Sequence, residues 1–215
     1  MIAASLHPPC ARRLMPLLVG ILMLGSCGPI VQIGAKGPPA ESLLLIEADA
    51  IPVETEGAGR LNGPTIAVEL PQLPSMLQTL RLAVRTDANE IQYLSAASWA
   101  ETPSRLVQRL LSDTLAARGM AVIDRSQASA RPDAALSGTL RDFTLDVRAP
   151  GRSVVRVRYD AQLARPGEPR PLAIRRFEAS EPAASEAPAD VAAALSRATN
   201  RLAADLADWA GATLR

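Results

Sequence analysis

The sequence predicts an α+β fold, a two-layer sandwich in which two main helices cover one face of a mixed or mainly antiparallel sheet. Segments with apolar residues at alternate positions come in two groups, and a segment with apolar residues at helical spacing follows each group. Each helical segment has a single apolar stripe, which must be buried against another layer. The chain has 215 residues, of which 48% are hydrophobic, enough for one domain with a core.

The first group of predicted strands precedes the first helix. Short apolar runs at 43–46 and 66–70 are typical of strands. Leu80, Leu82 and Val84 alternate with Arg81, Ala83 and Arg85, and the segment 91–94 follows the turn-like residues 86–89. This second pair of segments predicts a β-hairpin.

The first predicted helix begins after Trp99. Thr102 is the expected N-cap, and Pro103 occupies the first helical position, where its missing N–H is harmless. Gly119 is expected to end the helix. The apolar stripe of this helix consists of Leu106, Leu110, Leu111, Thr114 and Leu115.

A long strand is expected at 134–147, and its alternation contains a defect. Leu136 and Leu140 have one parity, whereas the apolar residues from Phe143 onward have the other. One face of the strand can stay buried only if an extra residue is inserted near Arg141. The sequence therefore predicts a β-bulge there.

Further strands and a second helix complete the predicted domain. Residues 120–123 form a short strand, and residues 155–163 alternate between apolar and polar side chains, which is typical of a half-buried strand. A loop rich in Gly and Pro leads to a last strand at 172–179. The sheet is expected to bury the stripe of the last helix, which consists of Val191, Leu195, Ala198, Leu202, Leu206 and Trp209.

The N-terminus has the pattern of a lipoprotein signal peptide. Arg12 and Arg13 precede an apolar stretch of 12 residues, 14–25, whereas a membrane-spanning helix needs about 20. Leu24-Gly25-Ser26-Cys27 follows and resembles the bacterial lipobox, in which the cysteine is acylated and becomes the first residue. The alternatives are a secreted protein cut elsewhere, or a cysteine that is there by chance.

Acylation of Cys27 would anchor the chain to a membrane, stably once two or more acyl chains are attached. Gly28 follows the cysteine where an inner-membrane retention signal would have Asp, which favours the outer membrane. We therefore expect a removed signal peptide at 1–26, a lipidated tether at 27–40 and a single domain at 41–215.

Cleavage before Cys27 would remove His7 and Cys10, so the mature chain would have no His and no free thiol. This excludes His-based catalytic triads and His/Cys metal sites. A two-carboxylate hydrolase stays open, although no carboxylate pair is singled out. We expect no enzyme and no cofactor beyond the acyl chains on Cys27. The loss of Arg12 and Arg13 lowers the net charge from +1 to −1, and only 3% of residues are aromatic, which argues against a nucleic-acid partner.

Several motifs before the first helix resemble a known family. They are Val68-Glu69-Leu70-Pro71, Leu82-Ala83-Val84-Arg85, Ile91-Gln92-Tyr93 and Ser98-Trp99-Ala100-Glu101. Their order, with a long Ala-rich helix at the end of the chain, is similar to that of the ABC-type transport auxiliary lipoproteins, the PqiC-like family.

The resemblance implies a periplasm-facing, outer-membrane-anchored component of an MCE-type lipid transport system. Such a component would dock onto an MCE-domain protein and its ABC transporter, and it could form rings with copies of itself. The alternative function is that of a lipoprotein that assists outer-membrane assembly or envelope integrity through protein–protein contacts.

Three residues are candidates for contact with a partner or with lipid. Trp99 lies at a strand-to-helix junction, where it fills the core or lines a subunit contact. Arg156 and Arg158 belong to a segment, 141–176, that has nine arginines and four acidic residues. This segment is either a solvated sheet face or a surface for an acidic partner, a neighbouring subunit or phospholipid head groups.

Overall fold

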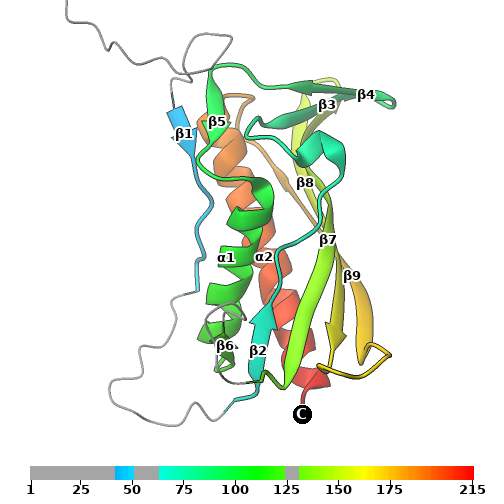
Figure 1. Ribbon diagram of the computed structural model, residues 1–215. Helices are drawn as coiled ribbons and strands as arrows, with labels where there is room; N and C mark the ends of the chain where they lie inside the picture. The colour runs from blue at the N-terminus through cyan, green and yellow to red at the C-terminus, as the bar shows by residue number, and fades with distance from the viewer. Residues whose placement is uncertain (1–41, 51–62, 124–130) are drawn as a thin grey trace, which may run out of the picture. The chain divides into compact units, whose positions relative to one another are not determined.

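Figure 1 shows the computed structural model of the chain, which describes residues 42–50, 63–123 and 131–215. These residues belong to one compact unit. The expected signal peptide and tether, with Cys27, lie outside the described residues. In chain order the elements are β1 (Ser42–Leu44), β2 (Thr65–Val68), the short 3-10 helix η1 (Ser75–Leu77), β3 (Ala83–Asp87), β4 (Glu90–Tyr93), β5 (Ala97–Trp99), α1 (Pro103–Ala117), β6 (Ala121–Ile123), β7 (Ala134–Ala149), β8 (Arg152–Ala164), β9 (Ala173–Pro182) and α2 (Pro188–Thr213).

The long strand β7 organises the main sheet. One edge of β7 pairs with β8 in the antiparallel direction along almost its whole length, and β9 continues the sheet beside β8. The other edge pairs in parallel with β2 near the start of β7 and with β3 near its end. With β6 beside β2 and β4 beside β3, the described part of this sheet has seven strands and is mixed, as predicted.

The predicted β-bulge in β7 is confirmed. The pairing with β8 shifts between Leu140 and Asp142, which makes Arg141 the extra residue. Leu140 and Phe143, which differ in parity, are both fully buried as a result. The bulge therefore keeps a single face of β7 directed at the core.

Both helices cover the same face of the main sheet, so the domain has the two layers that the sequence predicted (Figure 1). Helix α2 packs on β8 and β9, and α1 packs beside α2. Both predicted stripes are buried except for Trp209, which is half-buried and packs edge-on against Phe177 with ring centroids 5.5 Å apart. Neither described helix is long and apolar enough to cross a membrane.

The predicted ends of α1 are close to the observed ones. Thr102 occupies the N-cap position with Pro103 behind it, but the Thr102 hydroxyl makes no capping bond to the helix backbone and lies 3.1 Å from the Ser104 hydroxyl instead. Gly119 follows the helix with a φ of 82°, a conformation that glycine adopts without strain.

Strand β1 stays outside the main sheet. It pairs in parallel with β5 as a separate two-stranded ribbon. The residues after it run along the helices, where Asn200 of α2 donates to the carbonyl of Glu47 at 2.8 Å and accepts from the N–H of Asp49 at 2.8 Å. Ile46, which lies between β1 and Glu47 in the chain, is buried in the core. The first described segment is therefore attached to α2.

Candidate functional site

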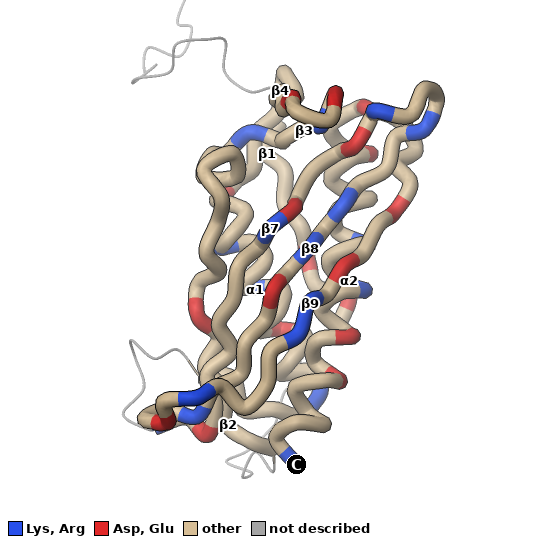
Figure 2. Tube along the Cα trace, turned by 90° about the vertical axis from the view of Figure 1, so that its right-hand side faces the viewer, with Lys and Arg blue, Asp and Glu red and all other residues tan. Residues whose placement is uncertain are grey.

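Charged residues recur along the neighbouring strands β7, β8 and β9, as Figure 2 shows, and most of them belong to the face of the main sheet that the helices leave uncovered. Side chains alternate along a strand, so Arg156, Arg158 and Asp160 of β8 all lie on this face, and their cross-strand neighbours on β9 are Ser180, Glu178 and Arg176. We call this surface the charged face. Its charged residues are Arg85, Arg141, Asp142, Asp146, Arg148, Arg156, Arg158, Asp160, Arg176 and Glu178.

Asp146 is held between two arginines of the charged face. Arg148 Nη2 lies 2.7 Å from Asp146 Oδ2, and Arg156 Nε lies 2.9 Å from the same oxygen. These hydrogen bonds, above all those from Arg148, hold the pKa of Asp146 well below its ordinary value although the carboxylate is almost fully buried. Asp146 is therefore ionised at neutral pH and fixes the position of Arg156.

Asp160 connects all three strands of the charged face. Arg176 on β9 donates to it from Nε at 2.6 Å and from Nη2 at 3.1 Å, and Arg141 on β7 donates from Nε at 3.0 Å. Hydrogen bonding by Arg176 is the main cause that lowers the pKa of Asp160 to about 2, with Arg141 acting in the same direction.

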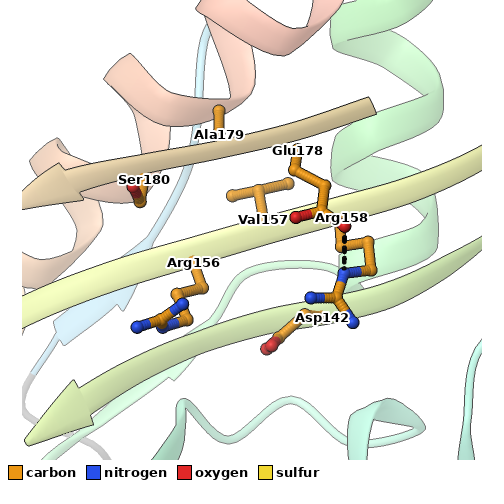
Figure 3. A pocket seen from close by; sticks show the side chains of 7 residues that line it. All are labelled: Asp142, Arg156, Val157, Arg158, Glu178, Ala179 and Ser180. Carbon is orange, nitrogen blue, oxygen red and sulfur yellow. Dashed lines mark ion pairs between the residues drawn. The ribbon is translucent and has the colours of Figure 1, made fainter. Parts of the chain in front are cut away.

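Arg156 and Arg158 border a shallow pocket of about 100 Å³ in the charged face (Figure 3). Arg158 Nε lies 2.8 Å from Glu178 Oε1, the pair that is marked by a dashed line in the figure. Both arginines use Nε in these ion pairs and are about half exposed. Because a guanidinium has five N–H donors, their Nη groups can still bind an acidic group of a partner.

The charged face has the chemistry of a binding surface and carries no imidazole or thiol. The described residues include no His and no Cys, and they contain no group of His, Cys, Asp and Glu side chains that could hold a metal ion. Its six arginines outnumber its four carboxylates, so the surface keeps a positive excess. The charged face can therefore attract an acidic surface of a partner electrostatically.

Trp99 lies in the core, away from the charged face. It is 1% exposed, and its ring packs against that of Phe143 with centroids 5.4 Å apart. This burial agrees with the interpretation of Trp99 as a core residue. Of the three predicted contact residues, only Arg156 and Arg158 lie together at the surface.

Sequence reasoning missed the carboxylates that organise the charged face. Asp146 and Asp160 each bind two arginines; three of these four arginines lie on neighbouring strands, and Arg148 lies two residues after Asp146 on β7. Alternation along β8 predicts that Asp160 lies on the same face as Arg156. This was the signal in the sequence that could have identified Asp160 as part of the charged face. The partner strands, and therefore the ion pairs, required the register of β7 and β9.

A second groove, of about 460 Å³, lies between α1 and the strands β2 and β6 and was not predicted. Gln108 of α1 donates to the carbonyl of Val68 at 2.9 Å, and Arg109 binds both carboxylate oxygens of Glu101 at 2.9 and 3.0 Å. Its lining mixes these polar groups with apolar side chains; it consists of Val68, Glu101, Arg105, Gln108, Arg109, Ser112, Val122 and Ile123.

Comparison with known proteins gives a family and two similar folds. The model of a protein family described as "ABC-type transport auxiliary lipoprotein component" matches residues 45–207. A crystal structure of a DUF330-family protein from Xanthomonas campestris superimposes with a TM-score of 0.69 at 21% identity, covering 80% of this chain and 95% of that one. A crystal structure of an uncharacterised protein has a TM-score of 0.56 at 17% identity, covering 68% and 92%. A search of the curated proteins found no significant match.

Proposed function

Because the chain belongs to the family of ABC-type transport auxiliary lipoprotein components, we propose that it is a non-catalytic docking component of an MCE-type lipid transport system. In this proposal the acyl chains on Cys27 hold it in the outer membrane, and the domain faces the periplasm. It binds and positions an MCE-domain protein, whose ABC transporter supplies the energy.

The charged face is the observation that carries the proposal. It is the side of the sheet that neither helix covers, and it holds half-exposed arginines in fixed positions around the pocket of Figure 3. Carboxylates already positioned within the protein hold these side chains in place, which lowers the conformational entropy lost when a partner binds. Arg156 and Arg158 are therefore the expected centre of contact with an acidic surface.

Affinity purification of the full chain from membranes, followed by mass spectrometry, tests the proposal. We expect the wild-type chain to recover an MCE-domain protein and ABC transporter subunits. The double variant Arg156→Glu/Arg158→Glu should lose them, because reversed charges repel an acidic surface. Arg105→Glu is the matched control, since Arg105 is an exposed arginine on α1 in the opposite layer.

Two results would contradict this proposal. Repeated recovery of outer-membrane assembly factors without an MCE-domain protein would favour the alternative role in envelope assembly. Retention of the MCE-domain protein by the double variant would move the docking surface away from the charged face. The ring that the family resemblance implies is tested separately, by the mass of the lipidated protein in detergent.

A further inference from the structure

Exposed leucines gather around the β1–β5 ribbon. Leu43 is 69% exposed, Leu45 47% and Leu80 43%, and they are three of the five large hydrophobic residues that are exposed in the described part of the chain. Leu43 pairs with Ser98 on one side of β5, and the Leu80 carbonyl accepts from the N–H of Trp99 on the other side. The three leucines therefore border the same short strand.

Strand alternation explains why two of these leucines face outward. Ile46 is fully buried and Leu44 packs against the core, so Leu43 and Leu45 point away from it. Outward positions of an edge strand usually carry polar or charged residues. The outward apolar side chains of Leu43 on β1 and of Leu45 just after it therefore indicate a surface that is covered when the protein is in place.

An arginine–tyrosine pair includes Arg81, the residue that follows Leu80 in the chain. The guanidinium carbon of Arg81 lies 4.7 Å from the ring centre of Tyr93, and the Tyr93 hydroxyl donates to the carbonyl of Met76 at 3.1 Å. Arg and Tyr combine an apolar body with a polar tip, so they are favoured where an apolar phase meets water. This end of the domain thus has the composition of a membrane-interface surface.

The connection to Cys27 makes the bilayer the expected cover. Ser42 starts β1 at this end of the domain, opposite the C-terminus (Figure 1). Fifteen residues lead from Cys27 to Ser42, and a chain of that length spans at most about 50 Å. Helix α2, with 26 residues, is about 39 Å long, so the opposite end of the domain lies far from Ser42, where the segment that leads from Cys27 joins the domain.

We propose that the end formed by Leu43, Leu45, Leu80 and the Arg81–Tyr93 pair rests on the bilayer that holds the acyl chains of Cys27. This inference rests on the proposed lipid anchor and adds an orientation to it. The strands of the charged face then run away from the membrane. Arg156 and Arg158 stay accessible to a partner in the periplasm, because the bilayer covers the end of the domain and leaves its sheet face open.

Cysteine accessibility in the lipidated full chain tests the orientation. Leu43→Cys and Ile174→Cys are matched variants, because Leu43 is 69% and Ile174 67% exposed, and Ile174 is the second residue of β9, at the opposite end of the sheet. Each protein is reconstituted into vesicles of phosphatidylethanolamine and phosphatidylglycerol. Labelling by a membrane-impermeant maleimide is then measured relative to the total labelling in urea. Wild-type protein, whose Cys27 is acylated in the proposal, gives the background.

We expect the thiol at position 43 to react severalfold more slowly than the thiol at position 174. A fluorophore at position 43 should also be quenched by lipids with nitroxide head groups, and a fluorophore at position 174 should not. Equal labelling at both positions overturns the orientation. Protection of position 43 without lipid quenching also overturns it, because a protein contact would then cover the leucines. If neither variant stays with the vesicles, the lipid anchor itself is wrong.

Discussion

Arg141, the residue that the bulge inserts into β7, donates from Nε to Asp160 of β8 at 3.0 Å. The bulge thus does more than restore the buried face of β7, because the inserted residue becomes part of the charged face. Arg176 binds the same carboxylate from β9. A single carboxylate therefore connects the three strands that present the proposed docking surface.

The stability of the domain should fall in acid because of these pairs. The pKa of Asp160 is about 2 in the folded chain, below its ordinary value of 3.8, so its ion pairs stabilise the fold above pH 3.8 and this stabilisation is lost as the pH falls towards 2. Asp146 acts in the same direction. The free energy of unfolding, measured with urea, should be lower at about pH 2.5 than at about pH 6. In Asp160→Asn the difference between the two pH values should be smaller.

The control for this experiment is Asp205→Asn, which removes an exposed carboxylate of α2 outside the charged face. This variant should lose as much stability in acid as the wild-type chain. If Asp160→Asn loses as much free energy of unfolding in acid as the wild-type chain, the ion pairs of Asp160 do not contribute to the pH dependence of stability.

Deletion of Arg141 should be far more damaging than its replacement. Arg141→Ala removes an exposed ion pair and should lower the free energy of unfolding by no more than about 1 kcal/mol. The deletion removes the bulge, so either Leu140 or Phe143 must turn outward. We expect no folded protein from the deletion, measured by circular dichroism and urea unfolding. A deletion variant as stable as Arg141→Ala would contradict the role of the bulge.

The bulge could be predicted because its signal is local. The parity of the apolar residues changes within one segment, and any buried strand must correct that change. The parallel pairing of β7 with β2 and β3 has no such signal. It depends on contacts such as Val68 with Leu136 and Ala83 with Thr144, between residues that are far apart in the sequence.

The ion pairs of the charged face are equally non-local. The sequence placed Arg156 and Arg158 on one face, because alternation requires only the strand itself. Their carboxylate partners, Asp146 and Glu178, lie on different neighbouring strands. The register that brings them together also includes a second irregularity of β7, between Asp146 and Ala149, which the sequence did not predict.

Trp99→Ala should lower the free energy of unfolding by about 3–5 kcal/mol, because it removes a buried aromatic side chain and leaves a cavity beside Phe143. Trp209→Ala should cost less, since Trp209 is only half-buried. Urea unfolding of both variants checks this order. A small stability loss for Trp99→Ala together with lost self-association would show that Trp99 acts at a subunit contact instead.

Cys27→Ala should abolish the incorporation of fatty acid and release the protein from membranes, because the thiol that carries the acyl chains is absent. Metabolic labelling with a radioactive or alkyne-bearing fatty acid, followed by membrane fractionation, measures both effects. Ser26→Ala keeps a small residue before the cysteine and serves as the control, which should still be labelled. Continued labelling of Cys27→Ala would disprove acylation at this position.

Tyr159→Phe should be neutral or stabilising, unlike most substitutions in a core. The Tyr159 side chain is fully buried, and its hydroxyl has no hydrogen-bond partner among the described residues. Burial raises the pKa of this hydroxyl, so it stays protonated. Removing an unsatisfied buried hydroxyl should raise the free energy of unfolding by roughly 1 kcal/mol. Urea unfolding measures this change. If Tyr159→Phe instead lowers the free energy of unfolding by a similar amount, the hydroxyl is hydrogen-bonded, for example to a buried water.

Gly138 provides the second arm of this test. A Cβ at position 138 would lie 2.6 Å from the Tyr159 hydroxyl oxygen and 2.4 Å from the carbonyl oxygen of Asp160. Gly138→Ala should therefore lower the free energy of unfolding by about 1–3 kcal/mol. In the double variant with Tyr159→Phe the loss should be only slightly smaller, because Phe removes the contact with the hydroxyl but keeps the contact with the backbone and the ring carbon Cζ, 2.5 Å from the Cβ. Fully additive effects would show that the two side chains do not share this space.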